Sequence, residues 1–375
     1  MKKVLFVATV VKKHINVFHL PALKMFKDYG WETSVCARND FEIKEDCIIS
    51  NCDKYYDIPF ERNPLKIKNI SCYREIKKLI EQNQYDIVYC HTPVGGAVAR
   101  LAARKNRKKG TKVIYMAHGF HFYDGAPLIN WLIYYPIEKW LSRYTDILIT
   151  INQEDYQRGL KFYAKKVKYI PGVGIDLNKF YFDEKVRIKK REELKLYDND
   201  FALLSVGELT KRKNHLMVIE AMNRLDNKNL HYFICGSGPL KSEIESLAKK
   251  YHLNNNIHLL GFRKDVYDIC NACDLFVFPS LQEGLPVALM EAMACQMPVV
   301  CTNIRGNSDL IVENKGGFLA EISPEDFANK IAICINKNNL KDMGRYNQEV
   351  IKNYNITKVL EMMKEIFELD KVVHE

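Results

Sequence analysis

The feature that most constrains the fold is an alternation of short apolar runs with segments of helical spacing, which continues through almost the whole chain. The first run, KVLFVATVV from Lys3, is rich in β-branched residues, and the FHLPALKMFKDYGW segment after it has apolar residues at helical spacing. Strands that alternate with helices form a parallel sheet covered on both faces. We therefore predict an α/β protein of the doubly wound class, whose ligands bind beyond the carboxyl ends of the strands.

The alternation is interrupted by a short stretch containing Gly and Pro, YIPGVGIDLNKF from Tyr169 to Phe180. At 375 residues the chain is longer than a single core usually allows, so we place a domain junction there. The prediction is a first domain of residues 1–172 and a second of residues 173–350 that repeats the alternation, the two facing each other across a cleft. Residues 351–375 indicate a helix, and one option is that it packs back on the first domain.

Charge and cysteine content limit the partners and the compartment. The net charge of +10 suits an anionic partner, but it does not choose between a nucleotide, a membrane surface and a nucleic acid. The 11 cysteines form no regular framework and no signal peptide is recognisable, so we expect reduced thiols in a cytosol. Cys270 and Cys273 lack a second pair at zinc spacing, which favours core thiols over a metal site. No apolar run reaches the roughly 18 residues that span a bilayer, so any membrane contact is expected to be peripheral.

Two carboxylates lie eight positions apart in FPSLQEGLPVALMEAM, namely Glu283 and Glu291. The apolar start of this stretch indicates a buried strand, its middle a loop, and its end from Pro286 a helix. A loop carboxylate, the unpaired amides of a first helical turn and a helix carboxylate can together hold a polyhydroxylated ligand that carries phosphate. An isolated pair at this spacing is more often a surface Glu beside an ordinary helix, so the surrounding motifs must decide.

A basic loop precedes a helix in GELTKRKNH, from Gly207 to His215. Lys211, Arg212 and Lys213 stand between the strand end and the helix start, and such cations make a diphosphate site. A solvated basic turn is the alternative. If this loop and the Glu283 loop lie at strand ends of the same sheet, the two motifs share one site.

Gly236 and Gly238 form another loop at a strand end, where the missing side chains permit close backbone approach. The loop is not a dinucleotide fingerprint, because Lys241 takes the sixth position of G-x-G-x-x-G. The sequence also lacks the P-loop pattern G-x-x-x-x-G-K-[ST]. These observations disfavour a nicotinamide enzyme and a P-loop enzyme.

Two further loops have weaker signals. The stretch GFRKDVYD can cover a nucleotide base with Phe262, Arg263 and the backbone near Val266, although a plain connection is equally open. Asp198 and Asp200 form a D-x-D of the kind that holds a metal on nucleotide sugars, but they precede a strand instead of following one. We therefore interpret the D-x-D as a turn.

Polar residues also follow the strands of the first half. His118 comes directly after a strand, next to a glycine, where its ring can hydrogen-bond a sugar hydroxyl or a reacting oxygen, and His121 is expected to be a packing neighbour. His14, Thr92 and Asn152 fall at other strand ends, and we assign them to the acceptor side of the site.

Two features indicate a membrane surface. The segment 104–112, RKNRKKGTK, holds six cations in nine residues. Apolar residues recur at spacings of 4, 4, 3 and 4 in a following helix: Ile129, Ile133, Ile137, Trp140 and Tyr144. Basic charge with aromatic residues favours anionic lipid headgroups. Such a stripe more often packs in a core, and this alternative stays open.

Taken together, five stretches of this chain resemble motifs of glycosyltransferase family 4: AHGFHF, GELTKRKNH, CGSGP, LLGFRKDV and EGLPVALME. That family consists of retaining nucleotide-sugar glycosyltransferases with two Rossmann-like domains, the GT-B fold. The stretches ATVVKKHINVFHLP and AHGFHFYDGAPLINWLIYYPIEKW further resemble the bacterial branch that builds exopolysaccharide and capsule repeat units. The resemblance implies a hexosyl- or N-acetylhexosaminyl-type transferase that needs no metal ion and no cofactor besides its UDP-sugar donor.

The resemblance also implies roles for single residues. Glu283 would contact the donor sugar, Glu291 the ribose hydroxyls, Arg212 and Lys213 the diphosphate, and His118 the region of the transferred sugar. The remaining donor-binding positions would be Gly207, Gly236, Gly238, Phe262, Arg263, Val266, Gly284, Leu285 and Pro286. Family members often carry Arg directly after the first Gly of the diphosphate loop, where this chain has Glu208, so the Lys211 to Lys213 cations must supply the charge. The Gly-rich first loop of many members is replaced by VVKKHIN.

From these observations we predict a cytoplasmic enzyme, peripheral on the inner face of the cell membrane, that moves a sugar from a UDP-sugar to a polyprenyl-diphosphate-linked saccharide. Fixed cations and helix amides would stabilise the departing diphosphate, and front-face substitution would retain the anomeric configuration. One alternative is a nucleotide-sugar epimerase or isomerase of the same fold, and another is a catalytically silent binding partner. Nucleic-acid binding is disfavoured, because the cations are not interleaved with aromatic residues along a recognisable motif.

Overall fold

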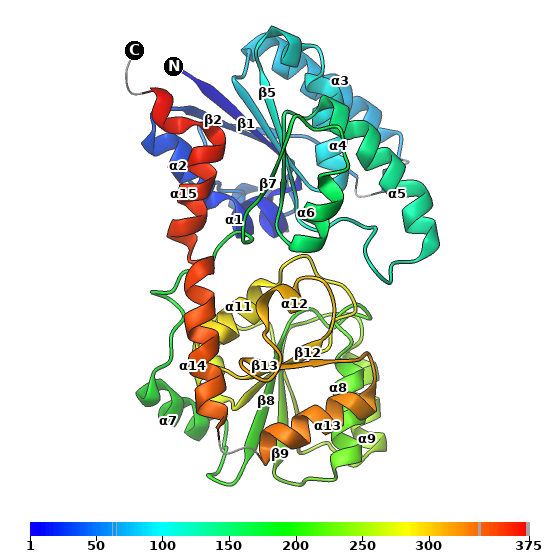
Figure 1. Cartoon of the computed structure of the whole chain (residues 1–375), viewed down its shortest axis with the longest axis vertical. Coiled ribbons are helices and arrows are strands. Elements are labelled where there is room, and N and C mark those ends of the chain that lie inside the picture. The colour runs from blue at the N-terminus through cyan, green and yellow to red at the C-terminus, as the bar shows by residue number, and fades with distance from the viewer. Residues whose placement is uncertain (62, 65, 337–338, 373–375) are drawn as a thin grey trace. The chain divides into compact units, whose positions relative to one another are not determined.

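The computed structural model describes residues 1–61, 63–64, 66–336 and 339–372. The chain divides into two compact units, Met1–Val173 with Thr357–Glu375 and Gly174–Ile356. Each unit is a parallel sheet covered by helices (Figure 1). The predicted class, a pair of doubly wound α/β domains, is confirmed for each unit.

The sheet of the first unit has seven parallel strands in the order β3-β2-β1-β4-β5-β6-β7. Their bounds are β1 (Lys3–Val10), β2 (Glu32–Arg38), β3 (Lys54–Asp57), β4 (Ile87–His91), β5 (Lys112–Ala117), β6 (Ile147–Thr150) and β7 (Lys166–Tyr169). The strand order reverses between β1 and β4, which pair with Val4 opposite Ile87. Crevices for ligands form at such a switch point, beyond the carboxyl ends of the strands.

Helices cover both faces of this sheet. They are α1 (Asn16–Phe18), α2 (Leu20–Asp28), α3 (Lys68–Asn83), α4 (Pro93–Ala103), α5 (Leu128–Leu141), α6 (Gln153–Gly159) and α15 (Ile356–Phe367), with a π-helical turn at Val11–Ile15 and 3₁₀ turns at Lys44–Asp46, Asn106–Lys109, Ser142–Tyr144 and Leu369–Val372. α3 shows why they pack: Cys72, Ile76 and Ile80 recur at every fourth position and enter the core together. Among the described residues, no helix has both the length and the apolar composition needed to cross a bilayer.

The last helix of the chain belongs to the first unit. The ring of Phe367 lies 5.0 Å from Phe26 and 4.9 Å from Tyr89 between centroids, and Glu368 pairs with Lys112 at 3.3 Å. α15 therefore lies beside α2, from the opposite end of the sequence (Figure 1).

Residues 351–375 were predicted as a helix, and beyond Ile351 the α-helix runs only from Ile356 to Phe367. α14 (Leu340–Ile351) ends in a 3₁₀ turn at Lys352–Tyr354, and α15 begins after it. The break arises because this backbone pairs with another segment: Ile175 donates to the carbonyl of Tyr354 and accepts from the amide of Ile356, both at 2.9 Å. Residues 373–375 lie outside the described part.

The second unit repeats the pattern with six parallel strands in the order β10-β9-β8-β11-β12-β13. Their bounds are β8 (Phe201–Val206), β9 (Leu230–Cys235), β10 (Ile257–Gly261), β11 (Leu275–Phe278), β12 (Val299–Thr302) and β13 (Gly317–Ala320). Every residue of β11 and β12 is buried, which agrees with strands covered on both faces. The order reverses between β8 and β11, so this unit has its own switch point there.

The helices of the second unit are α7 (Glu184–Glu193), α8 (His215–Leu225), α9 (Lys241–Lys250), α10 (Val266–Ala272), α11 (Val287–Ala294), α12 (Asn307–Leu310), α13 (Pro324–Ile335) and α14. The C-x-x-C pair falls at the end of α10, where Cys270 and Cys273 are free, buried thiols. Burial raises the pKa of Cys273 well above its usual value. The prediction of core thiols is confirmed for this pair.

Candidate active site

Two loops that were singled out in the sequence meet at the carboxyl edge of the second sheet. The basic loop follows β8 and the Glu283 loop follows β11, and these strands are neighbours. The amide of Leu281 donates to the carbonyl of Arg212 at 2.8 Å, which ties the two loops together. The switch point of this unit therefore brings the cations and the loop carboxylate into one place.

Glu283 pairs with two of the three cations of the basic loop. Its Oε1 accepts from Arg212 Nη1 at 2.8 Å and from Lys213 Nζ at 2.7 Å. Lys213 is buried, and its Nζ lies 4.4 Å from the ring centroid of Phe278. Burial lowers the pKa of Lys213, and the neighbouring Glu283 opposes this shift. The side chains of Glu283 and Lys213 are only 10% and 11% exposed, so their interaction is screened by water less than a surface pair.

The glycine loop after β9 supports the basic loop from one side. A Cβ on Gly236 would lie 1.9 Å from the carbonyl oxygen of Gly207, and one on Gly238 would lie 2.5 Å from that of Leu209. The amide of Leu209 also donates to the carbonyl of Ser237 at 3.1 Å. Glycine is thus required for close packing between two loops.

The helix after Glu283 begins at Val287, one residue later than predicted, because Pro286 is its N-cap residue and has an extended backbone conformation. Leu285 and Pro286 are buried and lead into its first turn, whose amides have no acceptor within the helix. In the second turn, burial raises the pKa of Glu291 to about 7, and the positive charge of Lys179 opposes that rise. This helix therefore offers free amides at its start and, further along, a carboxyl group that titrates near neutral pH.

Arg305 is a site residue that the sequence analysis missed. It is 7% exposed, and its Nε donates to the carbonyl of Glu283 at 3.1 Å. Gly306 next to it has φ +83°, and a Cβ there would lie 2.4 Å from the carbonyl oxygen of Gly284. The loop after β12 thus fixes the backbone that carries Glu283. The signal was present in the sequence, because NIRGN follows the apolar run PVVC from Pro298, as the other site loops follow apolar runs.

A buried series of hydrogen bonds holds the end of the basic loop in place. His215 Nδ1 lies 3.0 Å from the hydroxyl oxygen of Tyr232, which donates to Ser205 Oγ at 2.8 Å. Burial lowers the pKa of His215 to about 4, so the ring is neutral at physiological pH. These hydrogen bonds connect His215, the first residue of α8, to Tyr232 in β9 and Ser205 in β8.

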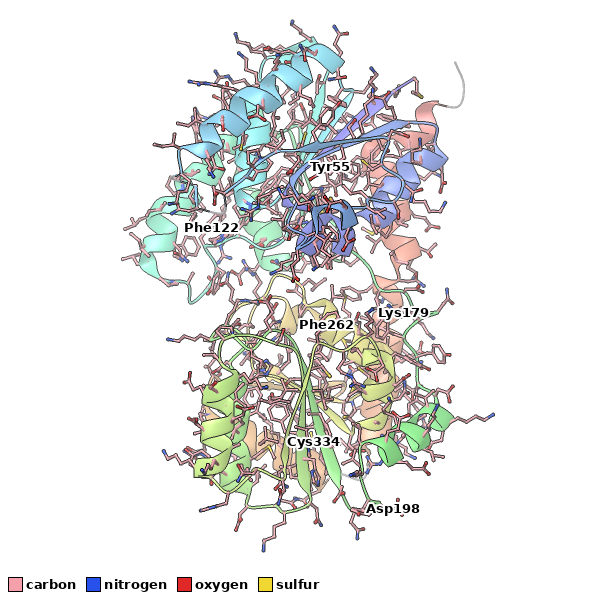
Figure 2. All side chains as sticks on the ribbon, turned by 180° about the vertical axis from the view of Figure 1, so that it is seen from behind. Tyr55, Phe122, Lys179, Asp198, Phe262 and Cys334 are labelled. Carbon is pink, nitrogen blue, oxygen red and sulfur yellow. The ribbon has the colours of Figure 1, made fainter. Side chains whose placement is uncertain are left out.

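The GFRKDV loop lies at the same edge of the sheet, after β10. Phe262 is 79% exposed there (Figure 2) and Val266 begins α10. Arg263 donates twice to Asp265, at 2.7 and 2.5 Å, and these bonds lower the pKa of that carboxyl group. Arg263 is therefore engaged within its own loop, while Phe262 presents an exposed ring.

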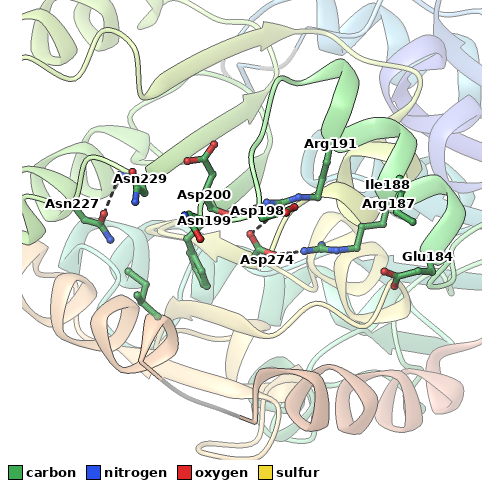
Figure 3. Close-up of a pocket in the computed structure, with 12 residues that line it drawn as sticks. Glu184, Arg187, Ile188, Arg191, Asp198, Asn199, Asp200, Asn227, Asn229 and Asp274 are labelled. Atoms are coloured by element: carbon green, nitrogen blue, oxygen red, sulfur yellow. Dashed lines mark hydrogen bonds and ion pairs between the residues drawn. The ribbon is translucent and has the colours of Figure 1, made fainter.

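The opposite edge of the second sheet carries the D-x-D and a pocket of about 470 Å³. Asp198 lies at the far end of the unit from Phe262 (Figure 2), and Asp200 accepts from the amide of Tyr197 at 2.8 Å in a turn, as predicted. The pocket is lined by paired charges: Figure 3 shows the guanidinium group of Arg187 directed at Asp274, with a contact of 2.5 Å. This pocket lies away from the loops that carry Glu283.

In the first unit, His118 belongs to a cluster of four histidines at the carboxyl edge of the sheet: His14, His19, His91 and His118. Burial lowers the pKa of each ring, that of His118 to about 4. The sequence analysis selected His14 and His118 but missed His19 and His91. A usable signal was the position of His91 as the last residue of a buried strand.

The other first-unit predictions have different outcomes. Thr92 precedes α4 at φ +59° and ψ 150°, a strained conformation for a β-branched residue. Asn152 is fully buried, and its side chain caps α6 by accepting from the amide of Asp155 at 2.8 Å. Its amide nitrogen donates to the Asp155 carboxylate, so both polar atoms of this side chain form hydrogen bonds within the fold. His121 packs against Tyr134, with ring centroids 4.8 Å apart, as expected of a packing neighbour.

The core interpretation of the apolar stripe is wrong, because its isoleucines and tryptophan are exposed. We define the apolar face of α5 as six side chains that are 44% to 74% exposed: Leu128, Ile129, Leu132, Ile133, Ile137 and Trp140. The helix packs on the core through its other face, with Trp131, Tyr134 and Tyr135. A buried ion pair between Arg100 and Glu138, at 2.9 Å, fixes the helix in this orientation.

The basic segment, residues 104–112, lies at one end of this helix. Arg107 donates to the carbonyl of Arg143, just beyond α5, at 2.8 Å and pairs with Asp146 at 2.9 Å. The other cations at its start are exposed: Arg104, Lys105, Lys108 and Lys109. Exposed positive charge therefore adjoins an exposed apolar helix face.

Comparison with known proteins determines the family. The family model for glycosyl transferases group 1 matches residues 186–350, and that for glycosyl transferase 4-like proteins matches residues 3–152. EpsD of Bacillus subtilis (strain 168), whose name assigns it to the glycosyltransferases, is 38% identical over 373 residues, which cover 98% of this chain and 96% of EpsD. The chain belongs to glycosyltransferase family 4.

A second relative of this glycosyltransferase is the Escherichia coli UDP-Gal:alpha-D-GlcNAc-diphosphoundecaprenol alpha-1,3-galactosyltransferase. It is 31% identical over 328 residues, with 83% of this chain and 84% of the relative covered. The relatives named here are transferases, which gives no support to an epimerase or to a silent binding partner.

Solved structures establish the fold of this glycosyltransferase. Anabaena HepE in complex with UDP and glucose matches with a TM-score of 0.80 at 19% identity, over 98% of this chain and 100% of HepE. Sucrose-phosphate synthase from Thermosynechococcus elongatus matches with a TM-score of 0.80 at 16% identity, over 98% of each chain. The GT-B fold predicted from the sequence is confirmed.

Proposed function

We propose that this glycosyltransferase moves a hexosyl or N-acetylhexosaminyl group from a UDP-sugar to a saccharide carried on polyprenyl diphosphate. The observation that carries the proposal is the meeting of Arg212, Lys213 and Glu283 at the switch point of the second unit. The name of the Escherichia coli relative, which specifies UDP-Gal and a diphosphoundecaprenol acceptor, supports the same substrate classes. The product would enter an exopolysaccharide, a capsule or a related glycan.

The donor would bind along the Glu283 loop and α11. Its diphosphate would accept charge-assisted hydrogen bonds from Arg212 and Lys213, and the amides at the start of α11 would add partial positive charge. Glu283, which contacts both cations, would then lie beside the sugar and accept from its hydroxyls. Glu291 would accept from the ribose hydroxyls.

We further propose that transfer needs no metal ion. The reaction develops negative charge on the departing diphosphate, and preorganised cations stabilise such charge without reorganisation. Arg212 and Lys213 are held in position by the Glu283 carboxylate, so they are preorganised in this sense. Turnover that survives treatment with a chelator would support this step, and a strict requirement for a divalent ion would contradict it.

The stereochemical proposal is retention by front-face substitution. The bond from the anomeric carbon to the leaving phosphate oxygen breaks, the acceptor oxygen bonds to the same face, and the leaving phosphate takes the acceptor proton. His118 would lie near the transferred sugar in the first unit. Inversion at the anomeric carbon of the product would rule this mechanism out.

The acceptor is proposed to reach the enzyme at the membrane surface. The apolar face of α5 can enter the boundary between headgroups and acyl chains, while the exposed cations of the basic segment contact anionic lipid. A polyprenyl-linked acceptor is anchored in the same leaflet. We therefore propose a peripheral location on the inner face of the cell membrane.

The test of the donor class is thermal stabilisation of the purified protein by UDP-, GDP- and ADP-sugars and their parent diphosphates, each with divalent metal and with chelator. We expect stabilisation by the UDP compounds under both conditions. Transfer is then assayed with the stabilising donors and a polyprenyl-diphosphate-linked saccharide in vesicles. Conversion of the UDP-sugar without an acceptor, or stabilisation by another nucleotide class alone, would contradict the proposal.

A further inference from the structure

We propose that the four clustered histidines of the first unit, His14, His19, His91 and His118, bind a late first-row divalent transition metal ion such as Zn²⁺. The inference rests on the geometry of this cluster and not on the proposed transferase reaction. It gives a further role to two residues already assigned above, His14 on the acceptor side and His118 near the transferred sugar.

The ring nitrogens of the cluster already have nearly the spacing of a tetrahedral site. His14 Nε2 and His19 Nε2 are 3.1 Å apart, and His118 Nε2 and His91 Nδ1 are 3.4 Å apart. One nitrogen from each ring lies within 4.8 Å of those of all the others. Metal–nitrogen bonds of about 2.0–2.1 Å place tetrahedral ligands about 3.4 Å apart. Two edges thus already have about the length of tetrahedral edges, and the remaining separations, which are up to 4.8 Å, must shorten to complete the site.

The fold holds these rings at and beyond the carboxyl ends of three adjacent strands. His91 is the last residue of β4, His118 comes directly after β5, and His14 lies in the π-helical turn after β1. β1, β4 and β5 are consecutive in the sheet, so their carboxyl ends converge. His19 follows five positions after His14, between α1 and α2. π-helical turns are rare and are frequent at functional sites, which agrees with this placement.

Hydrogen bonding within the protein does not satisfy the cluster. The two histidine–histidine contacts can pair one nitrogen of each ring, depending on the tautomers. His91 Nε2 remains buried without a hydrogen-bond partner among the described residues, and His91 is fully buried. Unsatisfied polar atoms of this kind are uncommon in native proteins and call for an explanation. A bound ion explains this one if His91 binds it through Nε2, with Nδ1 left to face His118 Nε2.

The ligand set selects the class of metal. Imidazole nitrogen suits Zn²⁺, Cu²⁺ and Ni²⁺, whereas Mg²⁺ and Ca²⁺ require oxygen ligands. The cluster consists of histidines alone among the described residues, with no carboxylate in the group. We therefore expect selective binding of the late transition metals.

The experiment uses the full chain, stripped of metal by a chelator and desalted. Co²⁺ is titrated in while visible absorption is recorded, because tetrahedral Co²⁺ gives intense ligand-field bands. We expect one Co²⁺ per chain with tetrahedral bands, loss of these bands on addition of Zn²⁺, and no competition from Mg²⁺. Octahedral Co²⁺ spectra, or no saturable binding, would overturn the proposal.

The variants His14→Gln and His19→Gln remove single ligands, and His121→Gln is the matched control from the loop that follows His118. Loss of a ligand should weaken Zn²⁺ binding by more than about tenfold, while the control should bind as the parent protein does. Circular dichroism and metal-free melting curves show whether each variant is folded, and His14→Gln serves if His19→Gln does not fold. Equal binding by the His14 variant and the parent, or equal loss in the control, would overturn the assignment.

This test is separate from that of the proposed function. The UDP-dependent shift of the melting temperature reports on the second unit and is measured in the same samples. Metal binding without a UDP-dependent shift would support the metal site and count against the donor proposal. A UDP-dependent shift without metal binding would support the donor proposal and count against the metal site.

Discussion

At the scale of single residues, Glu283 connects the charges of the candidate site, since it holds Arg212 and Lys213 in one place. We expect Glu283→Gln to abolish transfer and to leave UDP affinity within a few fold, because the proposed partner of the carboxylate is the sugar and not the nucleotide. Product formation and calorimetric titration with UDP measure the two effects. A parallel loss of UDP affinity would assign Glu283 to the nucleotide instead.

Lys213 gives the complementary prediction. Lys213→Ala removes a buried charge-assisted contact to the diphosphate, worth about 1.5–3 kcal/mol, so UDP should bind at least about tenfold more weakly. Lys211→Ala is the control, because Lys211 is an exposed cation of the same loop. Equal losses in the two variants would indicate a general charge effect and remove Lys213 from its assigned role.

Glu291 links stability, pH and binding. Burial raises its pKa from 4.5 to about 7, so the fold favours the neutral acid. The group costs nothing below pH 4.5. A penalty develops between pH 4.5 and 7, where the carboxyl ionises in the unfolded chain but not in the folded one, and it levels off at about 3 kcal/mol above pH 7. Lys179, the charged neighbour, reduces that penalty.

We therefore expect Glu291→Gln to unfold at higher urea concentration than the parent protein at pH 8, and at a similar concentration at pH 4.5. The same variant should bind UDP more weakly, since an amide is a poorer acceptor for the ribose hydroxyls. Urea titrations at both pH values and UDP titrations at pH 8 check this. A stability difference that does not depend on pH would show that the carboxyl group titrates normally.

Residue positions were predictable from the sequence where the strand pattern was strong. The convergence of Arg212 and Glu283 followed from placing both after strands of one sheet. The direction of each side chain was not predictable, because tertiary packing sets it: Asn152 points into a helix cap and Arg263 into Asp265. The position of Arg305 after a strand was visible in the sequence, but its contact with Glu283 was not, since only the packed loops place it there.

At the scale of elements, α5 carries the membrane prediction. We expect the double variant Ile133→Asp/Ile137→Asp to lose flotation with vesicles that contain anionic lipid, because two charges would enter the apolar boundary. Ile188→Asp, at an exposed position on α7 that is 56% accessible, is the control and should float as the parent protein does. Unchanged flotation of the double variant would remove α5 from the membrane contact.

The strands that the sequence missed are the edge strands β3 and β7 of the first unit. All six strands of the second unit and the five inner strands of the first have apolar runs that the pattern detects. β3 and β7 have no buried residue: β3 has two half-buried residues between two exposed ones, and β7 alternates exposed with half-buried residues. Both lie at the edges of the sheet. An edge strand is covered less than a central one, so its composition is closer to that of a loop.

At the scale of the whole molecule, the chain returns to its first unit at the end. Phe367 is 2% exposed and packs on Phe26 and Tyr89. We expect Phe367→Ala to destabilise the first unit by about 3–5 kcal/mol, seen as a lower melting temperature for that transition in calorimetry. Tyr197→Ala, at a position that is 77% exposed, is the control. A variant that melts as the parent does would show that α15 contributes little to this unit.

The return of the chain has a consequence for synthesis on the ribosome. The first unit needs residues from Thr357 onward, whereas the second is one continuous segment, Gly174–Ile356. The unit that emerges first therefore has its Phe26 and Tyr89 surface uncovered until the residues from Thr357 onward have emerged, whereas the second unit can complete its core earlier. Nascent chains stalled near residue 356 would expose that apolar surface to chaperones.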